Sequence, residues 1–224
     1  MRVVSLVPSV SETLLAWGIT PIAVTRFCEQ PSLRAVGGTK DPDVTAIVEL
    51  GPELVVMCHE ENRLEDFEAL VAAGLRVEAL RIESLDDVNA GLTGLAAAVG
   101  TSTPDPFRPP PFEGERRTAY VPIWRRPWMT LAADTYGASL LAALGVDVVV
   151  AAGEDRYPEM DLVEAAAAEP DLVLAPSEPY PFAARHVPEL ESVAPVVLVD
   201  GQDLFWWGAR TPMAFDRLAR TLAR

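Results

Sequence analysis

The chain has 224 residues, half of them hydrophobic, and its 33 acidic and 18 basic side chains give a formal net charge of −15. This composition predicts a globular protein with a sizeable core. It argues against partners with negative surfaces, such as nucleic acid or an anionic membrane, which attract basic proteins. No apolar run approaches the roughly 20 residues of a membrane span, and the N-terminus lacks the pattern of a secretory leader. As given, the sequence predicts a cytoplasmic protein, or an extracytoplasmic one if a leader was omitted.

In the first half of the chain, short apolar runs alternate with segments of helical periodicity. The apolar runs predict strands at residues 2–7, 21–25, 53–57 and 76–80. Helical segments are expected at residues 9–17, 44–50, 64–71 and 85–99. Ser9 and Glu12 match a capping box, so Ser9 is expected to cap the first of these helices.

The second half repeats this alternation. Strands are predicted at residues 117–123, 146–150, 172–175 and 196–199. Helices are expected at 162–168, after a cap at Asp134 or Thr135, and after a cap at Thr211. Strands that alternate with helices in this way predict an α/β protein with mostly parallel sheets.

A proline-rich stretch, residues 101–114, separates the two halves and is expected to be extended and semi-rigid. We therefore predict an N-terminal α/β lobe at 1–100, a connector at 101–114 and a C-terminal α/β lobe at 115–224. Residues 52–62 and 170–182 echo each other, since each combines proline, an acidic residue, an apolar run and a polar loop. This echo indicates two similar α/β units, with the loops after both strands as walls of a ligand cleft.

Aromatic side chains are concentrated in loops of the second half. Trp124 and Trp128 lie in one loop after a strand, and Trp206 and Trp207 lie in another. Further aromatic residues lie in or near such loops, namely Tyr136, Tyr180, Phe182 and Phe205. Aromatic residues in loops at strand ends are typical of a binding surface for a large, flat or partly apolar ligand. Basic side chains suited to ligand carboxylates or phosphate accompany them, namely Arg125, Arg210 and, as a weaker candidate, Arg26.

The sequence offers little support for catalysis or for a bare metal site. Cys28, Cys58, His59 and Glu60 have the ligand types of zinc or iron sites, but no CxxC or HxxxH spacing. The two cysteines could instead form a disulfide, and the other histidine, His186, is expected to cap a helix or face solvent. No GxSxG, HExxH or phosphate-binding glycine loop occurs. We predict that the protein is not an enzyme and has no catalytic or metal-ligating residues.

Several motifs, in order along nearly the whole chain, resemble those of one protein family. In the first half they are SLVPS with Glu12, VT with Cys28, VGGTK, and EENR with Glu65 and Asp66. In the second half they are IWR with PWMT, DTY, SEPYPF, and DG with Trp206 and Gly208. The chain thereby resembles the substrate-binding proteins of ABC importers of the cobalamin and ferric-siderophore class, the helical-backbone metal receptors of the TroA-like superfamily.

The resemblance implies two Rossmann-like lobes with a ligand cleft between them, and a backbone helix that is shortened here by the proline-rich connector. It implies that acidic residues at the lobe tips, Glu12, Glu61 and Glu178, dock onto a membrane permease. The full set expected to bind ligand is Ser9, Arg26, Cys28, His59, Glu60, Trp124, Arg125, Trp128, Tyr136, Glu178, Tyr180, Phe182, Trp206, Trp207 and Arg210.

The sequence therefore predicts a substrate-binding protein for a metal-bearing organic ligand, a corrinoid such as cobalamin or a ferric siderophore. The ligand would be carried, with no catalytic cofactor, and the expected partners are this small molecule and an ABC permease. The alternative is a cytoplasmic metal-handling protein or metalloenzyme that uses Cys28, Cys58, His59 and Glu60. A pair of lobes that has kept the fold and lost its ligand is a third reading.

Overall fold

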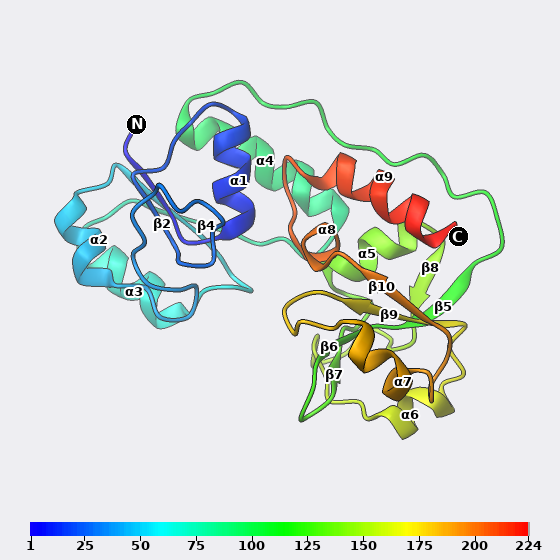
Figure 1. The fold of residues 1–224 in the computed structure, drawn as a ribbon. Helices are drawn as coiled ribbons and strands as arrows, with labels where there is room; N and C mark the ends of the chain where they lie inside the picture. The colour runs from blue at the N-terminus through cyan, green and yellow to red at the C-terminus, as the bar shows by residue number, and fades with distance from the viewer. Residues whose placement is uncertain (224) are drawn as a thin grey trace. The chain divides into compact units, whose positions relative to one another are not determined.

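A computed structural model describes residues 1–223 and divides the chain into two compact units (Figure 1). Unit 1 contains residues 1–82, 86–106 and 207–210, and unit 2 contains 83–85, 107–206 and the chain from Thr211. Each unit thus includes a short segment that is remote in sequence from the rest of it. Within the described residues, no helix has the length and apolar character needed to cross a membrane.

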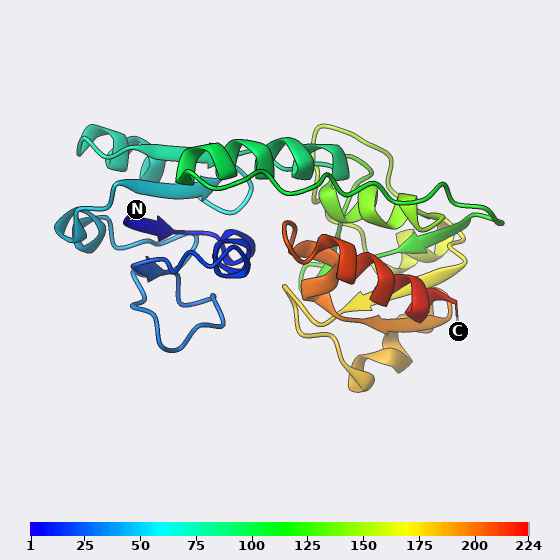
Figure 2. The same cartoon turned by 90° about the horizontal axis from the view of Figure 1, so that it is seen from above.

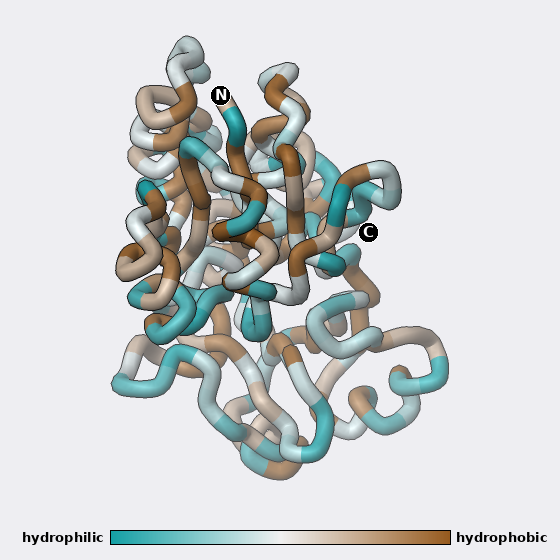
Figure 3. The backbone as a smooth tube through the Cα atoms, turned by 90° about the vertical axis from the view of Figure 1, so that its left-hand side faces the viewer, coloured by the Kyte–Doolittle hydropathy of each residue, from teal (hydrophilic) through white to brown (hydrophobic). Residues whose placement is uncertain are grey.

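Unit 1 is built on a four-stranded parallel sheet in the order β2-β1-β3-β4. Its strands are β1 (Val3–Ser5), β2 (Ala23–Val24), β3 (Leu54–Cys58) and β4 (Val77–Leu80). Its helices are α1 (Pro8–Ala16), α2 (Val44–Leu50), α3 (Leu64–Ala72) and α4 (Leu85–Val99), of which Leu85 is assigned to unit 2. Figure 3 shows hydrophobic and hydrophilic segments alternating along the backbone.

The core of unit 1 forms where the central strands meet the helices. All five residues of β3 are buried, and Val55 and Met57 pack in one cluster with Val4, Leu6 and Leu70. Because β3 is buried on both faces of the sheet, its sequence is an unbroken apolar run and does not alternate between apolar and polar residues.

The predicted cap of the first helix is wrong. Helix α1 begins at Pro8 with Val7 as its N-cap residue, and no side chain caps it. Ser9 lies inside the first turn and is buried. Proline is favoured in the first turn because it has no backbone N–H to satisfy and its φ is already helical, so Pro8 moves the helix start ahead of Ser9.

Unit 2 has a second four-stranded parallel sheet in the order β10-β9-β5-β8. The strands are β5 (Arg117–Tyr120), β8 (Val146–Val148), β9 (Leu172–Pro176) and β10 (Val196–Val199). The helices are α5 (Tyr136–Ala143), α6 (Leu162–Ala167), the 3₁₀ turn η1 (Ala184–His186), α7 (Val187–Leu190), α8 (Gly201–Phe205) and α9 (Thr211–Leu222). Helices α5, α8 and α9 lie on one side of the sheet, with α9 against β10, and α6 and α7 lie on the other (Figures 1 and 2).

Two predictions for unit 2 need correction. The expected strand 117–123 is split into β5 and β6 (Pro122–Trp124), and β6 pairs antiparallel with β7 (Met129–Thr130) inside the expected loop. Proline cannot donate to a ladder, so Pro122 is a natural point for the chain to leave the sheet. The loop expected to carry Trp206 and Trp207 begins with helix α8, which Asp200 caps through its side chain. Of the two candidate caps for α5, the structure selects Thr135, whose hydroxyl accepts from Ala138 N–H.

The two sheets have the same strand order. Within each four-stranded sheet, the first strand along the chain (β1 or β5) lies between the second (β2 or β8) and the third (β3 or β9). The fourth strand (β4 or β10) lies at the edge, beside the third. The third strands are β3 and β9, which contain the apolar runs of the two echoing sequence segments. The predicted α/β class, with two similar units and mostly parallel sheets, is confirmed.

The proline-rich stretch has no helix or strand between Val99 and Arg117, and α4 ends before Gly100, whose φ of +74° favours glycine. Within unit 2, Phe107 packs edge-on against Phe215 at 5.6 Å, and Phe112 lies against Gly145. A pocket of about 410 Å³ opens there, near the amino ends of β5 and β8. It therefore lies at the opposite edge of the sheet from the loops expected to bind ligand.

Candidate aromatic ligand-binding surface

In unit 2, the loops after β5 and β9 leave neighbouring strands that run in the same direction. Because the second strand, β8, lies on the other side of β5, the connections diverge between β5 and β9. Such a topological switch point is where open parallel sheets bind ligands, at the carboxyl ends of the strands. The backbone joins the two loops directly, because Tyr180 N–H donates to the Ile123 carbonyl at 3.3 Å.

The aromatic residues predicted from these two loops form one cluster. Trp124 meets Tyr180 edge-on at 5.8 Å between ring centroids, and Trp128 stacks on Phe182 at 6.0 Å with planes 9° apart. Tyr180 and Phe182 are 4.7 Å apart and link the two pairs. Trp124 is 44% exposed, whereas Phe182 is buried. The cluster therefore combines a buried base with an exposed aromatic rim.

Arg125 lies within this cluster, and side chains of the same unit hold its guanidinium in place. Its guanidinium forms an ion pair of 2.9 Å with Glu189 of α7 and lies 5.8 Å from the Trp128 ring centroid. Hydrogen bonding with the Tyr180 side chain, followed by the charge of Glu189, raises the pKa of Arg125 against the effect of burial. Its Nε is buried with no hydrogen-bond partner. Arg125 is thus a fixed cation behind the aromatic rim with one donor still to satisfy.

His186 completes the cluster from the end of η1. Its ring lies 5.5 Å from Tyr180 and 5.6 Å from Phe182, and the residue is 6% exposed. Its Nδ1 accepts a hydrogen bond of 3.1 Å from Ala183 N–H. Of the two expectations for His186, capping therefore holds and a position facing solvent does not.

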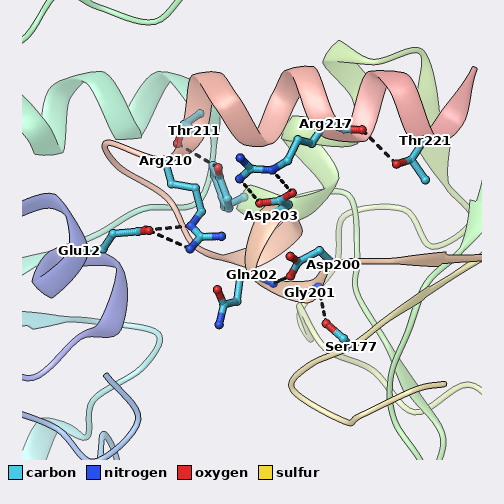
Figure 4. Close-up of polar contacts among 11 residues, drawn as sticks. Glu12, Ser177, Asp200, Gly201, Gln202, Asp203, Arg210, Thr211, Arg217 and Thr221 are labelled. Carbon is cyan, nitrogen blue, oxygen red and sulfur yellow. Dashed lines mark hydrogen bonds and ion pairs between the residues drawn. The ribbon is translucent and has the colours of Figure 1, made fainter. Parts of the chain in front are cut away.

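The other residues predicted in unit 2 lie around the neighbouring strand ends. Glu178 lies so close to Gly201 that a Cβ there would overlap its side chain, and Ser177 Oγ accepts from Gly201 N–H at 2.9 Å (Figure 4). Tyr136 is buried and its hydroxyl lies 3.2 Å from that of Thr211. Trp206 follows α8 and is partly exposed.

In unit 1, Cys28 belongs to a chain of buried hydroxyl groups at the carboxyl end of the sheet. Its Sγ lies 3.1 Å from Ser11 Oγ and 3.4 Å from Thr25 Oγ1, and Ser11 donates to Ser5 at 2.9 Å. Cys58 lies at the end of β3, where burial and then the charge of Glu61 raise the pKa of its thiol to about 12. Both cysteines are free thiols, so they form no disulfide.

The loop after β3 is held mainly by Asn62, a residue for which the sequence predicts no role. Asn62 is buried, accepts from Cys58 N–H at 2.8 Å and donates to the carbonyls of Leu6 and Thr39 at 3.1 and 2.9 Å. His59 is exposed, Glu60 and Glu61 are partly exposed, and Lys40 Nζ donates to the Glu60 carbonyl at 2.7 Å. An asparagine four residues after the end of a strand is the one sequence signal for this role.

Two arginines predicted to contact ligand form ion pairs within unit 1. Arg26 binds Asp41 in an exposed pair of 2.9 Å, and hydrogen bonding with Arg26 lowers the pKa of Asp41. Arg210 binds Glu12 of α1 through two hydrogen bonds of 2.8 Å (Figure 4). Trp207, on the same segment as Arg210, is 3% exposed. Over residues 1–223 the structure has no group of three or more His, Cys, Asp or Glu side chains placed to hold a metal ion.

No protein-family model matches the chain, and no curated protein matches it. Solved structures match it over nearly its whole length. The periplasmic vitamin B12 binding protein BtuF of Vibrio cholerae has a TM-score of 0.80 at 15% identity, with 99% of this chain and 96% of that chain covered. The periplasmic heme-binding protein BhuT, in complex with two hemes, has a TM-score of 0.80 at 20% identity, with 99% and 97% covered. The periplasmic heme-binding protein HutB of Vibrio cholerae has a TM-score of 0.76 at 18% identity, with 100% and 99% covered.

At these identities the likeness establishes the fold. The chain has the fold of these periplasmic binding proteins, so the predicted resemblance is confirmed at the level of fold. All three structures are described as binding proteins.

Proposed function

We propose that this chain is a substrate-binding protein of the ABC-importer type, and that its ligand is a metal-bearing organic molecule: a corrinoid, a heme or a ferric chelate. The observation that carries the proposal is the aromatic cluster at the switch point of unit 2. Its exposed Trp124 and partly exposed Tyr180 offer ring edges and faces to a flat, partly apolar ligand. The full-length fold likeness to proteins described as binding vitamin B12 or heme supports this ligand class.

The proposed contacts follow from where each side chain lies. Trp124, Trp128 and Tyr180 supply stacking surface, and the partly exposed guanidinium of Arg125 is suited to an anionic group of the ligand. The remaining proposed residues are Phe182, Tyr136, Glu178 and Trp206 in unit 2, and Ser9, Arg26, Cys28, His59, Glu60, Trp207 and Arg210 in unit 1. The buried members of this set, such as Ser9 and Tyr136, act by shaping the surface.

The proposal includes a membrane partner and a compartment. Glu12, Glu61 and Glu178 are proposed to dock onto basic residues of an ABC permease, a pairing that a net charge of −15 favours. Such a protein meets its ligand outside the cytoplasmic membrane. Cell fractionation tests the compartment, and co-purification of the permease with wild-type protein but not with charge-neutralised variants tests the partner.

Binding is tested by titrating purified protein with cyanocobalamin, hemin and a panel of ferric siderophores. Tryptophan fluorescence detects binding, and calorimetry repeats it because these ligands absorb light. We expect one-to-one saturation, with Kd raised by about tenfold or more in Trp124→Ala and Tyr180→Ala, since an aromatic contact at a binding site contributes on the order of 1–3 kcal/mol. Met213→Ala, at an exposed apolar residue of α9, is the control and should bind as wild type does.

Two results would overturn the proposal. One is the absence of binding to every ligand of the panel by correctly folded protein. The other is binding that Trp124→Ala and Tyr180→Ala leave unchanged, which would place the ligand elsewhere. Metal analysis of the purified protein separates the competing class, because a stoichiometric bare metal lost in Cys58→Ala and His59→Ala would indicate a metal-handling protein.

A further inference from the structure

We infer that His186 is a positioning residue for the aromatic cluster of unit 2, and that its neutral imidazole makes the arrangement of this cluster dependent on pH. The part of the inference that concerns ligand binding rests on the proposed function. The part that concerns packing does not, because it is tested in the ligand-free protein.

The hydrogen bond from Ala183 fixes the protonation state that His186 must have. Ala183 N–H can only donate, so Nδ1 of His186 must be unprotonated to accept at 3.1 Å. A protonated imidazole has N–H groups at both nitrogens and cannot accept. Protonation would therefore place two donors, the Nδ1–H of His186 and the Ala183 N–H, opposite each other. Because His186 is only 6% exposed, the Ala183 N–H would be left without its acceptor in a buried site.

The charges that face His186 also oppose its protonation. Burial is the largest cause that lowers its pKa, followed by the positive charges of Arg185 on η1 and Arg125 beyond β6. Glu189 of α7 acts in the opposite direction, but its carboxylate is shared with Arg125 in the 2.9 Å ion pair. Tyr180 and Phe182, which pack on the ring, complete its surroundings. The neutral form is thus the one that the folded unit selects.

The effect of protonation would reach the exposed rim through direct contacts. His186 packs on Tyr180 and Phe182; Tyr180 meets Trp124, and Phe182 stacks on Trp128. If the imidazolium moves out of its buried site, both aromatic pairs lose the ring that lies behind them. A change at one buried nitrogen therefore alters the surface that is proposed to bind ligand.

The first experiment follows the two histidines of the chain in ligand-free protein by ¹H–¹³C NMR between pH 8 and 5. His59→Asn, at an exposed residue of unit 1, assigns the two signals and serves as the matched control. We expect the His186 ring to titrate below its ordinary range, and the Ala183 amide and the Trp124 and Tyr180 ring signals to shift over the same pH interval. In His186→Asn, whose Oδ1 can accept from Ala183 N–H without titrating, these shifts should be absent.

Two outcomes would overturn the inference. In one, His186 becomes protonated while the Ala183 amide and the aromatic signals stay unchanged. In the other, His186→Asn shows the same pH-dependent shifts as wild type, which would assign them to another group. Near-UV circular dichroism of wild type, His186→Asn and His59→Asn at pH 7.5 and pH 5 confirms that each variant is folded.

The second experiment measures binding of whichever of hemin or cyanocobalamin saturates the protein. If only protein with neutral His186 binds, the apparent Kd of wild type rises by about tenfold per pH unit below the folded-state pKa. His186→Asn should lack this rise, and comparison of the two proteins with the same ligand cancels titration of the ligand itself. Equal pH dependence in both would overturn the link to binding, and failure of both ligands to bind would bear on the proposed function alone.

Discussion

Arg210 holds Glu12 through two hydrogen bonds of 2.8 Å, one from Nε and one from Nη2 to different carboxylate oxygens (Figure 4). The preceding residue contributes to the same attachment, because Ala209 N–H donates to Thr13 Oγ1 at 3.1 Å. Segment 207–210 is therefore fixed on one face of α1 although nearly the whole chain separates them. If Glu12 docks onto a permease arginine, that arginine must compete with Arg210.

We predict that Glu12→Gln lowers the free energy of unfolding by about 1–2 kcal/mol, because the partly buried Arg210 loses a charged, two-point partner. Urea denaturation followed by tryptophan fluorescence measures this change. Asp41→Asn is the matched control, since it breaks the exposed pair with Arg26 and should cost at most about 1 kcal/mol. An equal cost for both variants would contradict the importance assigned to the Glu12–Arg210 pair.

Gly208 tests the same attachment through the backbone. Its φ is +111°, and a Cβ there would overlap the Thr13 hydroxyl. We predict that Gly208→Ala destabilises the protein by about 1–3 kcal/mol through backbone strain and this overlap. Gly94→Ala in α4 has open space around its Cβ and should stabilise by about 0.5–1 kcal/mol through helix propensity. Thermal unfolding measures both changes: relative to wild type, we expect a lower Tm for Gly208→Ala and a higher Tm for Gly94→Ala.

The parts of the fold that the sequence predicts best are those set by local pattern. The apolar runs of residues 52–62 and 170–182 identified β3 and β9, which are the third strands of two sheets with the same order. Runs without polar alternation are characteristic of parallel strands buried on both faces. The loops after these two strands lie at the carboxyl edge of each sheet, and in unit 2 the aromatic residues of the loop after β9 form a cluster with those of the loop after β5.

The parts that were missed depend on partners remote in sequence or on very short elements. No local pattern relates Arg210 to Glu12, or His186 to the Trp124–Tyr180 pair, because these contacts form only when the chain has folded. The β6–β7 hairpin lies where the sequence predicts the end of a strand and a loop, because β7 has only two residues and too short a pattern to identify. Ser9 matches a capping motif, but the helix begins one residue earlier, at Pro8, so Ser9 lies inside the first turn.

The buried base and the exposed rim of the aromatic cluster should respond differently to truncation. Phe182 is buried in the core of unit 2, so Phe182→Ala should cost about 3–5 kcal/mol of stability. Trp124 is 44% exposed, so Trp124→Ala should cost about 1 kcal/mol or less while it weakens ligand binding. Denaturation and ligand titration of both variants separate the two roles. A large loss of stability in Trp124→Ala would show that this residue is mainly structural.

The two thiols should be protected from alkylation in the folded protein. Burial raises the pKa of Cys58 to about 12, so its thiolate fraction at pH 8 is on the order of 10⁻⁴. Cys28 is also buried and contacts Ser11. We expect iodoacetamide at pH 8 to modify neither cysteine in native protein and both in urea, as read by mass spectrometry of peptides. Rapid modification of Cys58 in native protein would contradict its position at the buried end of β3.

The lowered pKa of His186 predicts the direction in which stability depends on pH. The folded-state pKa lies below the ordinary value of 6.5, so between these two values the unfolded chain binds more protons than the folded chain. The contribution of His186 to stability is therefore complete above pH 6.5, is lost as pH falls toward the folded-state pKa, and decreases no further below it.

Within that interval, the free energy of unfolding of wild type should fall relative to His186→Asn by at most about 1.4 kcal/mol per pH unit. Urea denaturation of both proteins from pH 7.5 to 5 measures the difference, in which the titration of carboxylates common to both cancels. His59→Asn, at an exposed residue of unit 1, is the control for loss of a histidine as such. A difference between wild type and His186→Asn that stays constant across this range would mean that His186 tolerates its proton in the folded state.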